Sequence, residues 1–364
     1  MLALDAQSAF DRCLRQILIC ELHKAGLPGA ALQFIDNRLA SRTTVYEWDG
    51  VLMGPAEDQT GFEQGGINSS DYYKLYNNEQ LNSAQESSLG VDIGSSVVSA
   101  VGQADDVILL SGSLDDLRLL VRLTEKYCAK FRVKLEPGKT KLMVFNKPNN
   151  QFVVDHAKLT NSITISGQPI KFATEAEHVG VIRHTTGNLP NIVNRIAKHK
   201  KVVGSVLSAG MARRHRANIA ASLKVHQMYC TPVLFSGLAS LVLSRAEIKI
   251  VDNHYQSTLR NAQKLHEKTP RSIIYFLAGS LPGEAILHQK QLGLFSMICH
   301  LPGDPLHLHA QYVLTSASPS ANSWFQQILS LCLMYQLPHP LTLLSNPIKK
   351  QRFKKLVKLK ITDY

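Results

Sequence analysis

Hydrophobic residues follow two different periods along the chain. In the first half, short β-prone apolar runs at 1–4, 43–48 and 96–111 are separated by turn residues such as Asp49-Gly50. From about residue 191 to residue 266 the spacing of apolar residues changes towards 3.6, which is typical of helices. The pattern therefore predicts an α+β part followed by a helical part.

Helical segments interrupt the strands of the first half. Ser8 is predicted to cap a helix that carries Phe10, and a polar helix is predicted from near Ser70. A third helix is expected from Leu114 to about Phe131, with its apolar residues on one face. The segments after it predict a strand at 141–145 and a hairpin at 162–172 that turns at Gly167-Gln168.

The apolar runs around Asp105 and Asp106 predict a β-hairpin with two adjacent carboxylates at its tip. Asp5 ends an earlier strand, so all three acids can meet at one end of an antiparallel sheet. Three neighbouring carboxylates repel one another unless their pKa values rise or a divalent cation neutralises them. An Asp-Asp pair alone is weak support, because Asp115-Asp116 is a second such pair that fits the start of a helix.

Charge is distributed unevenly. The chain carries a net charge of +12, but residues 1–150 hold 15 Lys and Arg against 19 Asp and Glu, and the remainder holds 25 against 9. The two parts therefore have net charges of −4 and +16. A polyanion is expected to bind the second part, and cations the carboxylates of the first.

Several motifs together resemble those of reverse transcriptases from non-LTR (LINE-like) retrotransposons, and they stand in that family's order. They are LDAQSAFD at 4–11, GFEQGGINS at 61–69, QADD at 103–106, KTKLMVF at 139–145, HVGV at 178–181 and LAGSLP at 277–282. Gln103 stands where the family has an aromatic residue, Ser70 where it commonly has proline, and His178-Val179 where it has Tyr-Leu. As a set the motifs are specific, and they cover roughly residues 1–310.

The resemblance implies a right-hand polymerase palm, a ferredoxin-like antiparallel sheet with helices, followed by a helical thumb. The expected boundaries are 1–185 for the palm, 186–310 for the thumb and post-thumb region, and 311–364 for a poorly defined helical and basic tail. Because the family's fingers precede its first palm motif, we expect them to be mostly absent and the chain to be truncated at its amino terminus. The implied activity is RNA-directed DNA synthesis, and the alternative is a catalytically dead remnant that only binds nucleic acid.

Metal and catalytic roles are carried over from the family's motifs. Asp5, Asp105 and Asp106 would bind two Mg²⁺ or Mn²⁺ ions, which would activate a primer 3′-hydroxyl and stabilise the departing pyrophosphate. Lys139 would neutralise or protonate that pyrophosphate. The structural alternatives are that Asp5 only caps a helix and that Lys139 is an ordinary surface lysine.

The nucleotide pocket would include Phe10, Gln64, Gly65 and Gln103. Phe10 would be the gate that excludes the 2′-hydroxyl of ribonucleotides, unless it is an ordinary core residue, and Gln64-Gly65 would be a plain loop otherwise. Template and primer phosphates are expected to contact seven basic residues of the helical part: Arg195, Lys198, Lys200, Lys201, Arg213, Arg214 and Arg216. The expected partners are an RNA template, a DNA primer and deoxynucleoside triphosphates, with no membrane and no inferable protein partner.

Three further features bear on location. The longest apolar stretch, 232–244, is shorter than the roughly 18 residues of a membrane span. The six cysteines are scattered without zinc-ligand spacing, as in intracellular proteins with reduced thiols. The protein is therefore expected inside the cell, in nucleus or cytoplasm. The basic segment 349–360 fits a nuclear address, a nucleic-acid arm or a frayed end.

Overall fold

A five-stranded sheet with the order β11-β8-β1-β7-β6 organises the first half of the chain. The computed structural model describes residues 1–40, 42–58, 60–63, 66–94, 96–145, 163–206, 208, 218–316 and 323–364. All neighbours in the sheet are antiparallel except β11 and β8. The strands are β1 (Leu2–Leu4), β6 (Ala100–Gln103), β7 (Asp106–Leu109), β8 (Lys141–Leu142) and β11 (Lys171–Phe172).

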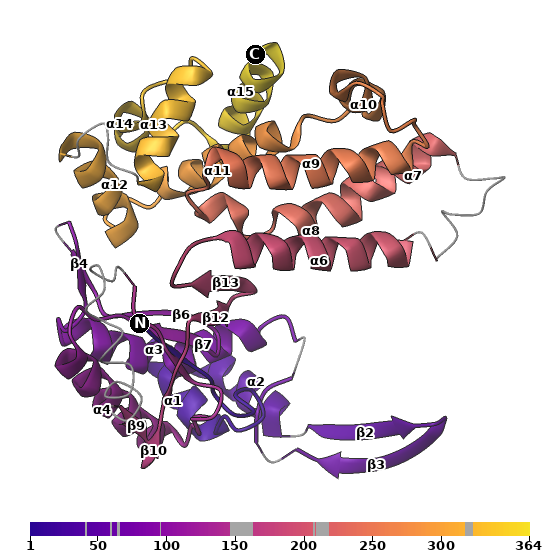
Figure 1. The fold of residues 1–364 in the computed structure, drawn as a ribbon. Helices are drawn as coiled ribbons and strands as arrows, with labels where there is room; N and C mark the ends of the chain where they lie inside the picture. Colours follow the sequence, from indigo (N-terminus) through magenta and orange to yellow (C-terminus); the bar gives the residue numbers. More distant parts are fainter. Residues whose placement is uncertain are drawn as a thin grey trace. The chain divides into compact units, whose positions relative to one another are not determined.

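The chain divides into two units. Unit 1 comprises residues 1–93 and 97–179, and unit 2 comprises residues 94–96 and 180–364. Unit 1 mixes strands and helices and unit 2 is mostly helical, so the expected α+β class is confirmed (Figure 1). The other strands are β2 (Thr43–Trp48), β3 (Val51–Glu57), β4 (Val91–Ile93), β5 (Ser96–Val98), β9 (Thr164–Ile165), β10 (Gln168–Pro169), β12 (Glu175–His178) and, in unit 2, β13 (Val181–His184).

Among the described residues of unit 1, four helices accompany the sheet: α1 (Arg15–Lys24), α2 (Gly29–Ala40), α3 (Ser69–Glu86) and α4 (Leu114–Phe131). The start of α4 is fixed by the Ser113 side chain, which accepts a hydrogen bond from the Asp116 amide. Asp115 and Asp116 lie in the first turn, where negative charge favours the helix dipole. The predicted bounds of this helix and the structural role of the second Asp-Asp pair are both confirmed.

The predicted helix after Asp5 is present as α1, but its predicted start at Ser8 is wrong. Ser8 has a φ of 50°, residues 7–12 form turns, and α1 begins only at Arg15. The carbonyls of Phe10 and Cys13 accept hydrogen bonds from the amides of Phe62 and Gly61. Because a distant loop takes these acceptors, the segment cannot continue as a regular helix.

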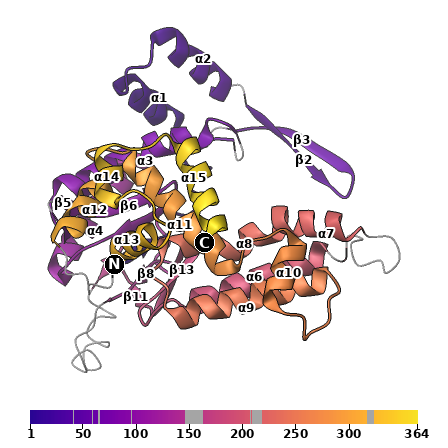
Figure 2. The same cartoon turned by 90° about the horizontal axis from the view of Figure 1, so that it is seen from above.

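Strands β2 and β3 form an isolated ribbon that extends away from the rest of unit 1 (Figures 1 and 2). The turn at Asp49-Gly50 has positive φ at both residues, as a two-residue hairpin turn requires. Pairing of Tyr46 with Met53 and of Trp48 with Val51 puts four large apolar side chains on one face. All four are more than half exposed, and Trp48 is 74% exposed.

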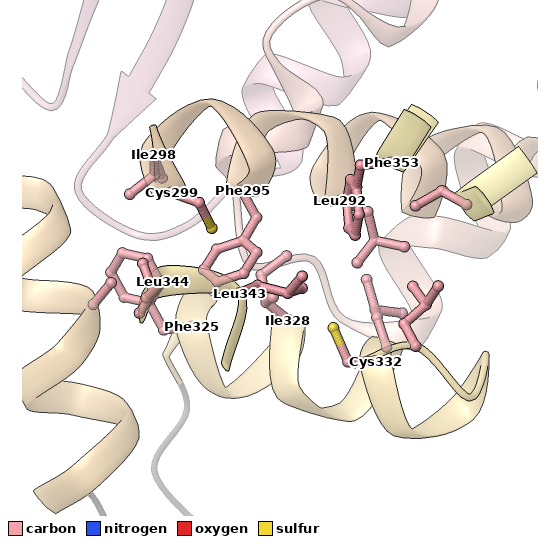
Figure 3. Packing of buried hydrophobic residues seen from close by; sticks show 14 of the residues in the cluster. Leu292, Phe295, Ile298, Cys299, Phe325, Ile328, Cys332, Leu343, Leu344 and Phe353 are labelled. Atoms are coloured by element: carbon pink, nitrogen blue, oxygen red, sulfur yellow. The ribbon is translucent and has the colours of Figure 1, made fainter. Parts of the chain in front are cut away.

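Unit 2 consists mainly of helices around two apolar clusters. One includes Ile192, Phe235, Tyr255 and Leu287, and the other extends from Leu292 to Ile361 and is shown in Figure 3. The elements are α6 (Leu189–Val206), α7 (Ile219–Val225), the π-helix η3 (His226–Cys230), α8 (Thr231–Phe235), η4 (Leu238–Ser240), α9 (Arg245–Ala262), α10 (Arg271–Ala278), α11 (Gly283–Cys299), α12 (Pro305–Ser316), α13 (Trp324–Met334), α14 (Pro340–Ser345) and α15 (Lys350–Asp363).

The basic end of the chain is a packed helix. In α15, Phe353, Val357 and Ile361 are buried in the second cluster of unit 2. The basic side chains between them point to solvent or are half-buried. A frayed end is therefore excluded, while the other two interpretations of this segment stay open. Among the helices that the structure describes, none has both the length and the apolar character needed to cross a membrane.

Candidate active site

The register of the central sheet brings Asp5 next to Asp106. Leu2 pairs with Leu109 and Leu4 with Val107, and continuing this register by one residue sets Asp5 opposite Asp106. Neighbouring strands lie about 4.8 Å apart, so the ends of β1 and β7 are adjacent. The two regions of carboxylates that are distant in sequence therefore meet at one end of the sheet.

The tip of the β6-β7 hairpin holds the second pair of acids. Gln103 pairs with Asp106, leaving Ala104 and Asp105 as the two turn residues. Ala104 has a φ of 54°, a conformation that costs free energy in a residue with a Cβ. Its carbonyl accepts a hydrogen bond from the buried amide of Asn77 on α3, at 3.2 Å. Asn77 thus anchors the turn that presents Asp105.

Electrostatics show that the three acids interact. Although the Asp105 side chain is exposed to solvent, partial desolvation raises its pKa, and the negative charges of Asp106 and Asp5 raise it further. The acid's own backbone amide opposes this shift. A cation bound beside Asp105 would favour its ionised form, because it would offset the repulsion from Asp106 and Asp5.

Lys139 and Thr140 approach Asp5 from the segment before β8. The Lys139 ammonium lies 3.6 Å from a carboxylate oxygen of Asp5, and the fully buried Thr140 hydroxyl accepts from the Asp5 amide at 3.4 Å. The Asp5 carbonyl accepts from the amide of Glu136 at 2.8 Å. Asp5 is therefore held by its backbone on both sides, with a positive charge next to its side chain.

Val179 binds the other acid. Its amide donates to the Asp106 carboxylate at 3.2 Å. Val179 has a φ of 49°, which is rare for a β-branched residue, and the next residue, Gly180, has a φ of 71°. The strained turn aims a backbone donor at the carboxylate, so this end of unit 1 helps to orient Asp106.

The donor chemistry fits magnesium, which prefers carboxylate oxygens. In the arrangement described, however, no group of three or more His, Cys, Asp or Glu side chains is placed to hold a metal ion. Asp5 faces Lys139, and Asp106 faces the amide of Val179. Each of these contacts involves a single carboxylate oxygen.

Phe10 lies beside this group of acids in the sequence but packs into a separate apolar cluster. Its ring is half-buried, with its centroid 4.8 Å from that of Tyr73 and an interplanar angle of 30°. The gate and core interpretations of Phe10 are both compatible with this position. Of the predicted nucleotide-pocket residues, Gln103 is exposed at the hairpin, whereas Gln64 and Gly65 lie outside the described residues.

The loop before Gln64 is tied to the segment that follows Asp5. Gly61 has a φ of 82°, and a Cβ at this position would lie 2.8 Å from the backbone oxygens of Phe10 and Asp11. The Thr60 hydroxyl donates to the Asp11 carbonyl at 2.8 Å. Only glycine permits this contact, so Gly61 fixes where Phe10 and the nearby loop lie relative to each other.

We expect Gly61→Ala to lower the free energy of unfolding by about 2 kcal/mol or more, since the new methyl meets backbone and the φ is unfavourable. Urea denaturation measures the change. Gly112→Ala is the control, because nothing lies within 4 Å of a Cβ there. Equal stability of the two variants would show that the loop and the Phe10 segment are not packed as described.

The basic residues predicted to contact phosphates divide into three groups. Lys200 and Lys201 are exposed on α6, and Lys198 is half-buried. Arg195 departs from the expectation, because it is only 6% exposed and donates to the Gly180 carbonyl within unit 2. It is therefore a structural residue rather than a surface cation. Arg213, Arg214 and Arg216 lie outside the described residues.

Three residues of the site were not predicted from sequence. Asn77, Thr140 and Val179 act through hydrogen bonds that depend on the three-dimensional arrangement. Only Asn77 could have been found from the sequence, because a polar residue on the apolar side of a predicted helix requires a hydrogen-bond partner.

Comparison with known families bears on the same part of the chain. The model of the family described as "Reverse transcriptase (RNA-dependent DNA polymerase)" matches residues 1–182. The match includes every part of unit 1 and all the acids discussed above. Among curated proteins, none matches the chain.

Proposed function

Because the chain belongs to the reverse transcriptase (RNA-dependent DNA polymerase) family, we propose that it derives from the non-LTR, LINE-like branch and adds deoxynucleotides to a primer 3′-hydroxyl. The observation that carries this proposal is the strand register that sets Asp5 opposite Asp106. The order of the six motifs supports the assignment to the branch. Residues 1–185, which include all of unit 1, would be the palm, residues 186–310 of unit 2 the thumb and post-thumb region, and residues 311–364 the basic tail.

In this proposal Asp5, Asp105 and Asp106 hold two divalent cations. When bound, Mg²⁺ would activate the attacking hydroxyl and neutralise negative charge on the leaving pyrophosphate. The Val179 amide would orient the Asp106 carboxylate through its hydrogen bond, and the Asn77 side chain would hold the hairpin turn through its hydrogen bond to the Ala104 carbonyl. Lys139, whose ammonium lies next to Asp5, would move to the leaving pyrophosphate once the carboxylate binds metal.

The substrates in this proposal are an RNA template, a DNA primer and deoxynucleoside triphosphates. Phe10, Gln103 and the Gln64-Gly65 segment would surround the incoming nucleotide. Unit 2 would hold template and primer phosphates through exposed lysines, including Lys200 and Lys201 of α6, without reading the sequence.

One observation favours the alternative function of a nucleic-acid-binding protein without catalysis. Within the described residues no group of three or more acids is arranged to hold a metal ion, and the ammonium of Lys139 lies next to Asp5. Primer extension on a poly(rA) template separates the two functions, because only the polymerase loses signal when Asp105 and Asp106 become asparagine.

Metal binding has a test that does not depend on activity. If the three acids share cations, MgCl₂ at about ten times its Kd should raise the free energy of unfolding by about 1.4 kcal/mol. Asp5→Asn/Asp105→Asn should remove this increase, as measured by thermal melts with and without EDTA. Asp115→Asn/Asp116→Asn, which removes equal charge at the start of α4, should retain it; an equal increase in all three proteins would place the metal elsewhere.

A further inference from the structure

Unit 2 contains a pocket at which three of its segments meet. It has a volume of about 640 Å³ and is lined by residues of 235–239, of α11 and of α15. Pockets of about 300–1,000 Å³ are typical of sites for small molecules or for parts of larger ligands. None of the proposed polymerase residues lines it.

The walls combine apolar and cationic groups. Ile286, Leu294 and Met297 supply an apolar surface, while Lys290, Lys350 and Lys354 are exposed among the lining residues. Within the described lining there is no Asp or Glu. The matching ligand has an apolar part that enters the pocket and negative charges that stay near the lysines.

Gly293 keeps the middle of the pocket wall open. It lies inside α11, where glycine costs roughly 0.5–1 kcal/mol relative to alanine. A Cβ at this position would meet nothing within 4 Å, and the φ of Gly293 lies outside the left-handed region. Local conformation therefore does not require glycine here, and what it provides is space in the pocket.

Polar groups in the pocket wall indicate which kind of apolar ligand fits, a planar heterocycle or a hydrocarbon chain. Ser236 and Gln289 line the pocket together with the aliphatic residues. A glutamine side chain both donates and accepts hydrogen bonds, which suits the edge of a planar heterocycle better than a hydrocarbon chain. Further exposed lysines of α15, Lys355 and Lys358, continue the positive charge along the helix.

We propose that this pocket receives an unpaired base of a nucleic-acid strand whose flanking phosphates contact Lys290, Lys350 and Lys354. The proposal rests on the proposed binding of nucleic acid by unit 2 and gives that binding a second component, a preference for single strands that carry bases. Phosphate contacts alone do not distinguish a strand with bases from one without them.

The experiment compares two fluorescent single strands of equal length and charge, oligo(dT) and a fully abasic strand, by anisotropy at fixed salt. The full chain should bind oligo(dT) about five-fold or more tightly, as expected for one enclosed base. Gly293→Trp, which fills the pocket, should abolish this preference and leave the affinity for the abasic strand unchanged. Gly293→Ala, which leaves most of the space, should retain the preference.

Three further variants test the pocket in case the tryptophan variant misfolds. Met297 is 54% exposed and lines the pocket, so Met297→Glu places a negative charge there without disturbing the core. It should also abolish the preference. Lys354→Glu should weaken binding of both strands more than Lys355→Glu, because only Lys354 lines the pocket.

The outcomes separate the two proposals. Equal affinity of the unchanged chain for both strands, or an undiminished preference in both Gly293→Trp and Met297→Glu, overturns the base pocket. If salt-sensitive duplex binding persists in that case, the proposed function of unit 2 stands. If no nucleic acid binds at all, the proposed function of unit 2 fails together with the pocket.

Discussion

The double substitution Asp105→Asn/Asp106→Asn is expected to reduce primer extension by about three orders of magnitude. Asparagine keeps the size of each side chain but removes the charge that would hold a cation at the hairpin tip. Loss of metal stabilisation of the transition state by roughly 4 kcal/mol corresponds to a thousand-fold lower rate. The measurement is incorporation of dTTP on poly(rA) primed with oligo(dT), in MgCl₂.

The control for this substitution lies in the same unit. Asp115→Asn/Asp116→Asn removes two adjacent charges at the start of α4, away from the end of the sheet that carries Asp105 and Asp106. It should leave the rate within about two-fold. If the Asp105-Asp106 variant extends primers as well as the unchanged chain, the polymerase proposal is rejected. Weak extension by every protein, with intact duplex binding, would instead support the nucleic-acid-binding alternative.

Low pH should destabilise unit 2 strongly, because the folded unit buries histidines in their neutral form. His199 of α6, His226 of η3 and His254 of α9 form one cluster, with the His199 Nδ1 atom 3.0 Å from the His254 Nε2 atom. Burial, with the charges of neighbouring histidines, lowers the pKa of His199 to about 3 and of His226 to about 4. Burial and nearby Lys200 also lower the pKa of His254.

The direction of the pH effect follows from proton binding. Below pH 6.5 the unfolded chain binds protons at these histidines while the folded chain does not, so stability is complete above that pH and is lost towards pH 4. Each histidine contributes about 1.4 kcal/mol per pH unit. From pH 6.5 to pH 5, His199 and His226 together should lower the free energy of unfolding of unit 2 by about 3 kcal/mol, because the unfolded histidines are only half protonated at pH 6.5 and the full slope applies only below it. Urea titrations at several pH values measure this loss.

Two variants of His226 separate titration from packing. The residue is 4% exposed, its ring packs near His199 and Tyr255, and neither ring nitrogen has a hydrogen-bond partner among the residues described. His226→Phe should flatten the pH dependence and also stabilise the protein at pH 7.5, since it removes unsatisfied polar atoms. His226→Gln should only flatten the dependence. Unchanged slopes would show that the histidine is not buried in the folded protein.

The sequence predicted local elements well where one face of the pattern was apolar. The helix from Leu114 to Phe131 and the hairpin around Asp105 were predicted because their periodicities are strong and their turn or cap residues are clear. The turn of the β9-β10 hairpin was placed one residue late, since the positive φ values lie at Ser166 and Gly167. Such shifts at element ends are common when only propensity is available.

Features that depend on distant contacts could not be predicted. A helix from Ser8 was plausible by its pattern, but hydrogen bonds from Gly61 and Phe62 take the carbonyls of that segment. Arg195 resembled a surface cation until the fold placed the Gly180 carbonyl beside it. The sequence also indicated that Asp5 ends a strand and that Asp106 lies at the tip of a hairpin, but not that the register sets them opposite each other.

The exposed ribbon of unit 1 has a practical consequence. The chain has two tryptophans, and they are in different units: Trp48 projects from the ribbon, whereas the Trp324 indole donates to the Ala239 carbonyl within unit 2. A solvated indole emits at longer wavelength than one enclosed by protein. Replacing Trp48 by phenylalanine should therefore leave an intrinsic fluorescent reporter for unit 2 alone, with which its unfolding can be followed apart from that of unit 1.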